Sequence, residues 1–560
     1  MPRAREMKSL KGLCLDDVER AVNDWINRLL VEKVSDSGST VIDLLEKGED
    51  DELYKRVSNF FDLLPSTLLL DIANLIPFKF RQKERSKGNQ LLWCYLEMLI
   101  SEGIAMVNQT AENVDGFLQV ASKRCPVRTQ FAKLLKNLEI IRSPGCDIFP
   151  YNLEPYLQRF QQLRVLNIGD GEIGDSCLEI LGAFCKDLRE LDVSFCSKVT
   201  DVGLASLCVS VDHLGNKNES LGLCKSIVKL WTNGTQVTNS GIQVAIQNLP
   251  ELEYCDMASI QILAEMHQRD FRSKEQLEIP KYSFVDLKLK KKYSSPYTWG
   301  SLKMVLSLCP SLLKVHITAI AGLRNADLLS LISVERLCEL IIKGCEDLSE
   351  ITFDDGVTPL LEAKGRNLKG LKLQDLGIPI NINTICELCP NLDVLALTGN
   401  RKYTTSTWNS SRPKRIKLEI PKLKNLVKLC LGSCCASCRG PSPISCIPSE
   451  NLAFLLLSPL LVEIDIRNCD TLTDDVLLTA AQSNPFLHLE ELVLGGCHSI
   501  TNRSVDVFMQ ENGIKKVLLI GCSKLTLDNI VTWKVKAIQN DWNFMLGCIV
   551  FQELPIPEND

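Results

Sequence analysis

Cysteines form the clearest cluster of residues whose type and spacing suit metal chemistry. Cys435 and Cys438 are separated by two residues, as many zinc ligand pairs are, and Cys430, Cys434 and Cys446 lie nearby. A structural zinc needs four ligands, which this cluster could supply. Alternatively, Cys434 belongs to a buried core and the other cysteines line a loop. We favour the second interpretation and predict no metal site and no cofactor.

The other chemistry-bearing residues form no catalytic signature. Five histidines are present, and none lies in a metal-binding or nucleophile motif. The sequence contains no Gly-rich phosphate loop, no G-x-S-x-G turn and no supported pair of catalytic carboxylates. We therefore predict no catalytic residues and a protein that is not an enzyme.

Basic residues gather at two places. Lys288 begins a run that continues through residues 290–292, and residues 412–417 read RPKRIK. The first run is either a patch for nucleic acid or an anionic substrate, or the solvated face of a strand, and we favour the strand face. The second is either a surface loop or a nuclear localisation signal. A formal net charge of -6 gives no overall basic excess, so we expect no nucleic acid and no membrane as partner.

The composition is that of a soluble folded protein, with 45% hydrophobic and 24% charged residues. The N-terminal segment lacks the apolar stretch of a signal peptide, and no apolar run approaches the roughly 18 residues that span a bilayer. The longest candidate, residues 452–461, contains Pro459 and is expected to form buried helix and turn. The chain has 24 cysteines, and many of them recur at one position of a repeat. These features favour a cytoplasmic and/or nuclear location.

A repeat supplies the elements that must position all of these residues. Its clearest copy starts at Leu188 and continues through Leu191, Val193 and Cys196, which fits apolar-x-x-apolar-x-apolar-x-x-Cys. Starts at 163 and 188 are 25 residues apart, inside the range of leucine-rich repeats. Further copies with the cysteine start at Leu337, Leu426, Leu461, Leu489 and Ile514, and variants without it start near Leu163, Ile227, Phe284, Leu312, Leu368 and Leu392.

Each copy predicts a short strand, a turn and a helix. Thr200 followed by Asp201 is typical of a helix start, and the pairs that begin at Thr473 and Thr501 repeat it. One coil cannot bury its own apolar face, so about ten or more coils must stack, with strands on a concave side. The sequence therefore predicts an α/β fold, a leucine-rich-repeat solenoid (horseshoe) with a helical N-terminal region. Exposed residues on the strand side are expected to bind a partner, for example Arg189, Glu190 and Asp192.

The copies are irregular between residues 250 and 310 and between 340 and 460, where residues 401–417 lengthen one copy as a polar loop. We expect four regions along the chain. They are a helical docking region at 1–80, a helical connector and cap at 81–130, the solenoid at 131–535, and a C-terminal cap and tail at 536–560.

The pattern resembles the cysteine-containing subfamily of leucine-rich repeats, which is common in F-box proteins and other ubiquitin-ligase receptors. Near the N-terminus, Leu10, Cys14 and Val18 fit the elongin BC-box pattern Ser/Thr-Leu-x-x-x-Cys-x-x-x-aliphatic. Their spacing places all three on one helix face, and such a stripe binds in a partner's groove. The resemblance implies that these residues contact elongin C, which acts together with elongin B.

A second segment resembles the cullin-2 box, which has the pattern apolar-Pro-x-x-apolar-x-x-x-apolar. Leu64, Pro65, Leu68 and Ile72 match it, and proline suits the first position of a helix. The two boxes, in this order and joined to leucine-rich repeats, are similar to receptors of the zyg-eleven and zer-one type. The resemblance implies a substrate-recognition subunit that docks elongin BC and cullin-2 with its RING subunit, and binds a protein substrate of unknown identity.

The armadillo part of that family is not expected here, because only about 35 residues follow Thr526. The family's substrate specificity is therefore not carried over.

Two alternatives use the same residues. Residues 64–77, with Trp93 downstream, also resemble the start of an F-box, which implies the adaptor of an SCF ligase instead of elongin. Alternatively, the chain is a plain interaction scaffold whose N-terminal helices cap the solenoid. The stripe at Leu10, Cys14 and Val18 would then pack against the first repeats near Leu135 and Leu138.

Overall fold

The structure is a computed structural model that divides into two units, Met1–Ala258 and Ser259–Asp560. For three strand segments it describes the backbone alone, namely residues 106–110, 137–141 and 545–549. The other residues that it describes are 157–158, 161–208, 225–268, 280–289, 299–318, 322–344, 350–400, 402–404, 423–432, 447–508, 514–525 and 531–535.

The first unit contains a six-stranded parallel sheet whose strands are paired in sequence order. The strands are β1 (Met106–Thr110), β2 (Asn137–Ile141), β3 (Val165–Asn167), β4 (Glu190–Asp192), β5 (Lys229–Trp231) and β6 (Tyr254–Cys255). The helices between the later strands are α9 (Asp175–Phe184), α10 (Asp201–Cys208) and α11 (Asn239–Asn248).

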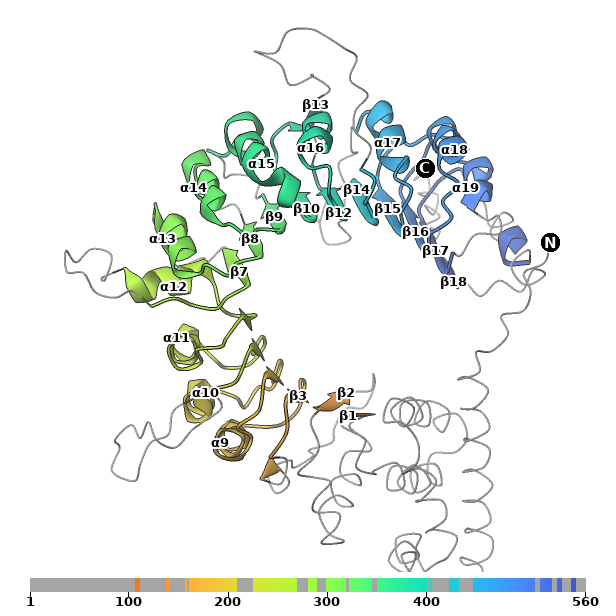
Figure 1. Ribbon diagram of the computed structural model, residues 1–560. Coiled ribbons are helices and arrows are strands. Elements are labelled where there is room, and N and C mark those ends of the chain that lie inside the picture. Colours follow the sequence, from red (N-terminus) through yellow and green to blue (C-terminus); the bar gives the residue numbers. More distant parts are fainter. Residues whose placement is uncertain are drawn as a thin grey trace, which may run out of the picture. The chain divides into compact units, whose positions relative to one another are not determined.

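The second unit contains a ten-stranded parallel sheet, and in Figure 1 its strands line the inner side while its helices cover the outer side. The strands are β7 (Asp286–Leu289), β8 (Lys314–Thr318), β9 (Glu339–Lys343), β10 (Gly370–Gln374), β12 (Val394–Thr398), β14 (Lys428–Gly432), β15 (Glu463–Arg467), β16 (Glu491–Gly495), β17 (Lys516–Ile520) and β18 (Met545–Ile549). The helices are α12 (Ile260–His267), α13 (Ser301–Leu308), α14 (Asn325–Leu329), α15 (Thr358–Lys364), α16 (Ile382–Leu388), α17 (Ser449–Leu456), α18 (Asp474–Ser483) and α19 (Asn502–Phe508).

Shorter elements complete the second unit. They are the 3-10 helices at Ser330–Ser333 and Gly365–Asn367, the π-helix at Phe353–Val357, and the paired strands β11 (Ile380–Asn381) and β13 (Tyr403–Thr404).

The alternation of strand and helix confirms the predicted α/β solenoid. In the copy that starts at Leu188, all four template residues are fully buried. Template positions of successive copies also pair with one another, so that Ile464 lies beside Leu492 and Leu492 beside Val517. This register matters because a slip of one residue would turn the apolar side chains to the opposite face. Each coil therefore completes the core of its neighbour.

The strands and the boundary between the units can be compared with the four regions that the sequence predicts. β1 lies within residues 81–130 and β18 within residues 536–560. The boundary between Ala258 and Ser259 lies inside residues 131–535, near the start of the irregular stretch at 250–310. Residues 1–80 lie outside the described residues.

The repeated cysteine is a core residue, as predicted. The Cys196 thiol donates a hydrogen bond to the Ile168 carbonyl oxygen at 3.3 Å, and Cys497 donates to Ile466 at 3.5 Å. Burial raises the pKa of the Cys196 thiol to about 11, so the thiol keeps its proton at neutral pH. These cysteines act as small apolar side chains with one weak donor, which joins a coil to the one before it.

Asn400 takes the place of the cysteine in the copy that starts at Leu392. Its side chain is only 2% exposed, and its amide nitrogen donates to the Leu373 carbonyl oxygen at 2.7 Å. Its amide oxygen accepts from the Leu376 backbone N–H at 3.0 Å. The asparagine therefore satisfies two backbone groups of the preceding coil, where a cysteine satisfies one.

Successive helix starts are joined by a repeated clamp between an aspartate and a threonine. The Thr200 backbone N–H donates to Asp175 Oδ1 at 2.8 Å, and the Thr200 hydroxyl donates to Asp175 Oδ2 at 2.7 Å. The same pair of bonds joins Thr238 to Asp201, and another joins Thr501 to Asp474. Each aspartate lies in the first turn of its helix, where the helix dipole favours a carboxylate.

The clamp explains a glycine three residues after two of these threonines. A Cβ at Gly203 would lie 2.3 Å from Asp175 Oδ1, and a Cβ at Gly241 would lie 2.4 Å from Asp201 Oδ1. The close approach of the carboxylate therefore requires glycine at both positions.

We predict that Asp474→Ala destabilises the second unit by about 1–2 kcal/mol, because a backbone N–H and a hydroxyl of Thr501 lose their acceptor. Urea denaturation, together with hydrogen exchange of residues 501–508, measures the loss. Asp475→Ala is the matched control, because Asp475 lies in the same first turn and is exposed. An equal loss in both variants would show that the helix dipole, and not the clamp, is responsible.

The same pair should respond to pH. Burial alone would raise the pKa of Asp474, but the hydrogen bonds from Thr501 outweigh it and hold the pKa below its usual value. A carboxylate with a depressed folded pKa stabilises the fold above its unfolded pKa, and that stability is lost as pH falls through the folded pKa. The difference between wild type and Asp474→Ala should therefore shrink in acid.

We predict that Asn400→Leu costs about 2–3 kcal/mol, because it leaves a buried N–H and a buried carbonyl of the preceding coil without partners. Asn400→Cys should cost less, since a cysteine at this repeat position donates to the same kind of carbonyl. Thermal denaturation of the three proteins tests the order. A leucine variant that is as stable as wild type contradicts this account.

Candidate protein-binding surface

The strand face of the second unit consists of the side chains that alternate with the core residues along each strand. In β8, Val315 and Ile317 are fully buried, whereas Lys314, His316 and Thr318 are half-buried on the opposite face. The parallel register brings these outward positions into rows across neighbouring strands. The sequence on this face is therefore free to vary without disturbing the core.

A basic patch occupies the part of this face formed by β7 to β10. We define the basic patch as Lys288, Lys314, His316, Lys343 and Lys372. The register places Lys288 beside His316, His316 beside Ile341, and Ile341 beside Lys372. Four lysines thus lie on four adjacent strands.

Two carboxylates, Asp286 and Glu339, lie within the same area. Glu339 is shared between two lysines, since Lys314 Nζ and Lys372 Nζ each lie 3.0 Å from one of its oxygens. Burial alone would raise the pKa of Glu339, but the bonds from these lysines outweigh it and lower the pKa below its usual value. Glu339 therefore remains ionised at neutral pH. Among the residues that the structure describes in this area, lysines outnumber carboxylates by four to two.

Asp286 is held less tightly in its charged form. Burial raises its pKa above the usual value, and the lysines at 314 and 288 only partly oppose that effect. Its Oδ1 atom is buried and has no hydrogen-bond partner among the described residues. Asp286 is thus a half-buried carboxylate beside the basic patch, with one oxygen that has no hydrogen-bond partner among the described residues.

His316 lies at the centre of the basic patch and is neutral at pH 7. Burial lowers its pKa to about 4, and the neighbouring Lys288, Lys314, Lys343 and Lys372 lower it further in the same direction. Its Nε2 atom is buried and has no hydrogen-bond partner within the described part of the chain. The ring therefore adds no charge at the centre of the patch.

A strip of small, uncharged residues follows the basic patch on β10 and β12. It comprises Gly370, Val394, Ala396 and Thr398. A Cβ on Gly370 would lie 2.8 Å from Glu339 Cγ, so glycine there gives the paired carboxylate its room. Because these side chains are short, the strip is a low floor beside the lysines.

The charges on β14 to β17 are balanced, in contrast to the basic patch. Three pairs lie on this part of the face, and each joins one cation to one carboxylate. They are Lys428 with Glu463, Arg467 with Asp465, and Lys516 with Glu491. The surplus of positive charge is therefore confined to the β7–β10 side.

The strand face of the first unit has a different character. Lys229 Nζ lies 2.8 Å from Glu190 Oε1, and the rings of Trp231 and Tyr254 are 5.4 Å apart. Asp192 accepts a hydrogen bond from the Ser194 backbone N–H at 2.9 Å, so it holds a turn. Of the three residues named from the sequence as free to bind, Glu190 and Asp192 already have local partners, and Arg189 is exposed but lies 3.8 Å from Glu251.

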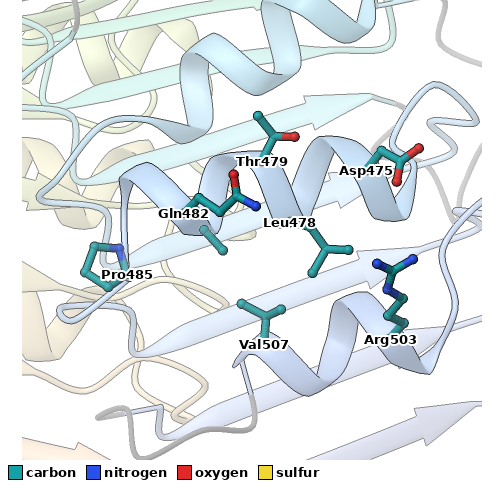
Figure 2. Close-up of a pocket in the computed structure, with 8 residues that line it drawn as sticks. Asp475, Leu478, Thr479, Gln482, Pro485, Arg503 and Val507 are labelled. Atoms are coloured by element: carbon teal, nitrogen blue, oxygen red, sulfur yellow. The ribbon is translucent and has the colours of Figure 1, made fainter.

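A groove of about 450 Å³ lies on the helical side of the second unit, between α18 and α19. Figure 2 shows Leu478 and Val507 facing each other across it, with Asp475 and Arg503 at one end. Its lining is mixed, and it contains no group of nucleophile and base. We therefore place the candidate site on the strand face.

Of the clustered cysteines, only Cys430 lies within the described residues. It is on β14, and burial raises the pKa of its thiol. No three His, Cys, Asp or Glu side chains converge as a metal site within the described ranges. The docking residues outside those ranges are Leu10, Cys14, Val18, Leu64, Pro65, Leu68 and Ile72, and the cysteines are Cys434, Cys435, Cys438 and Cys446. None of the helices that the structure describes is long and apolar enough to cross a membrane.

The match to a family model agrees with the coil geometry. The family model described as "Leucine Rich repeat" matches residues 184–208, which contain β4 and α10. The yeast complex of Rad7 and Elc1 is similar at 15% identity and a TM-score of 0.44, over 68% of this chain and 84% of that chain. An internalin from Listeria monocytogenes is similar at 11% identity and a TM-score of 0.32, over 86% and 95%. A leucine-rich-repeat protein from Leptospira interrogans is similar at 13% identity and a TM-score of 0.30, over 79% and 100%.

The fold assignment rests on the repeat match and on the stacked coils. The chain is a leucine-rich-repeat solenoid with the architecture of a protein-interaction scaffold. Its outward strand positions are the surface that such a scaffold offers to a partner.

We predict that His316→Gln makes the protein less sensitive to mild acid. A histidine whose folded pKa is about 4 and whose unfolded pKa is about 6.5 binds its proton more readily when unfolded, so stability falls as pH drops from 6.5 to 4. Because the ring is partly exposed, the full pKa shift is not converted into stability. Over this pH range the variant should lose on the order of 1 kcal/mol less of its free energy of unfolding than wild type. Urea denaturation at pH 7 and pH 4.5 measures it.

His488→Gln is the control, because it removes a histidine from an exposed position of the same unit. If both variants follow the wild-type pH dependence, His316 does not have the neutral state described above.

Proposed function

We propose that this chain is the substrate-recognition subunit of a cullin-RING ubiquitin ligase. In this proposal its N-terminal segment docks elongin BC, and its solenoid holds a protein substrate. The chain itself is not an enzyme, and it acts in the cytoplasm or the nucleus. It brings the substrate close to a separate enzyme, which raises the local concentration of the reacting groups.

The observation that carries the proposal is the joining of two docking patterns to a solenoid with an open, charged strand face. Leu10, Cys14 and Val18 form one apolar stripe when the segment is helical, and the small cysteine lets a partner's groove approach closely. Leu64, Pro65, Leu68 and Ile72 would help to select cullin-2 with its RING subunit. Support for this part comes from the sequence.

The solenoid supports the other half of the proposal. Its core is complete through the stacking of coils, so the strand face needs no further covering by this chain. Polar and charged side chains occupy most of the outward positions from β7 to β17, apart from the strip of small residues. A surface of this kind suits reversible binding of a polar protein ligand.

We predict that elongins B and C co-purify with the wild-type protein and that Leu10→Ala, Cys14→Ala reduces their recovery by about tenfold or more, because two of the three apolar contacts to the groove are lost. Quantitative pull-down from co-expressed, purified components measures the recovery. The matched control is Asp16→Ala, Glu19→Ala, which changes two neighbouring residues on the opposite helix face.

Three further arms make the result decisive. Leu64→Ala, Pro65→Ala should retain elongins and lose cullin-2. The F-box adaptor Skp1, offered in parallel, should not bind, and its capture in place of elongins would assign the chain to SCF ligases. Wild type that binds neither adaptor would leave a plain interaction scaffold and refute the ligase proposal.

A further inference from the structure

We infer that the basic patch on β7 to β10 binds an extended, acidic segment of a protein, whose aspartate and glutamate side chains contact Lys288, Lys314, Lys343 and Lys372. The inference names the substrate class of the proposed function. Only the identification of the bound segment as a ligase substrate rests on that function. Its physical content, binding of an acidic segment, stands on the strand face alone.

The spacing of the lysines suits an extended segment. Lys288 and Lys372 lie at the same level on the outer two of four adjacent strands. Neighbouring strands are about 4.8 Å apart, so the four strands span roughly 14 Å, which is the length of about four extended residues. A segment with acidic residues at alternate positions would present two or three carboxylates to the patch over that length.

The carboxylates that the structure describes around the patch do not balance its charge. Glu339 forms ion pairs with two lysines, Lys314 and Lys372. Burial disfavours the charged form of Asp286 and raises its pKa. Lys343 is exposed at the end of β9 and has no ion-pair partner among the described residues. Half-buried cations in a concave surface produce a stronger local field than scattered surface charges, so an anionic ligand is favoured here.

The neighbouring parts of the face favour a peptide. His316 is neutral at pH 7, and its Nε2 atom, at the centre of the lysines, has no partner in the described part of the chain. The ring therefore adds no charge between the lysines. Ala396 on β12 lies beside Lys372, and its short side chain leaves room there for the backbone of an extended segment.

The basic patch contains lysines and a neutral histidine but no arginine. Lysine ammonium groups act as compact point charges toward carboxylates and phosphates alike. The chain's formal net charge of -6 opposes the approach of a long polyanion such as nucleic acid. The spacing of the lysines across four strands favours an acidic protein segment as the ligand, and a phosphoserine probe tests phosphate as the alternative.

The test is fluorescence anisotropy with the purified full-length protein and three labelled probes of about ten residues. The first probe alternates Glu or Asp with Ser, the second replaces each acid with Gln or Asn, and the third carries phosphoserine at the Ser positions of the second. We expect the acidic probe to bind at least about tenfold more tightly than the amide probe, and its affinity to fall as salt is raised.

Two double variants locate the binding. Lys288→Gln, Lys343→Gln should weaken binding of the acidic probe by about tenfold, since each lost contact of this kind is worth up to about 1 kcal/mol. Lys303→Gln, Lys364→Gln removes the same charge from α13 and α15 on the helical side, and should leave binding unchanged. Circular dichroism of both variants checks that the fold is intact.

The inference is overturned if the amide probe binds as well as the acidic probe, if only the phosphoserine probe binds, or if the two double variants lose affinity equally. Co-purification of elongins with Lys288→Gln, Lys343→Gln should match wild type. A failure of elongin docking in wild type would therefore refute the ligase proposal and leave the inference on peptide binding in place. A failure of the acidic probe to bind would refute that inference and leave the ligase proposal in place.

Discussion

Every feature of this molecule depends on the fact that a single coil cannot bury its own apolar face. A strand of two to five residues and a short helix leave one side of the coil open, and only the next coil closes it. The parallel register holds the coils in phase, so Leu191 lies beside Leu230 and Ile464 beside Leu492. Thiols such as Cys196, the amide of Asn400 and the Asp–Thr clamps then satisfy polar groups where the coils meet.

This constraint separates the residues that maintain the fold from those that are free to bind. Inward positions of the strands are almost all Leu, Ile or Val with no exposed surface, because a cavity there would weaken two coils at once. Outward positions carry no such requirement. On β7 to β10 they accumulate lysine, and on β14 to β17 they hold matched pairs, so the same backbone presents two different electrostatic surfaces.

The repeat could be predicted from the sequence because its spacing is strict. The template positions, the core role of Cys196 and Cys497, and the helix starts after Thr200, Thr473 and Thr501 all followed from residue type and offset, and the structure confirms them. Asn400 was missed as an equivalent of the cysteine, although its offset from Leu392 identifies it. The N-terminal boxes stay a prediction.

The basic patch could not be predicted, because it depends on which residues of different coils become neighbours. The sequence drew attention to Lys288 and to residues 290–292 as a run along one chain segment. In the fold, Lys288 instead lies level with His316 and Lys372, and Glu339 lies between two lysines from other strands. Such a cluster becomes visible only once the register of four successive coils is known, because each coil contributes one or two charges.

Local contacts between coils also decide how far a change at the strand face can act. In a solenoid each coil contacts mainly its neighbours, so a substitution on β7 to β10 alters the stability of the coils beside it and little else. The outward lysines contribute charge without filling the core, and their removal leaves the apolar ladders of Val315, Leu340 and Leu371 in place. Ligand specificity can therefore change on this surface by exchange of charged residues while the fold remains the same.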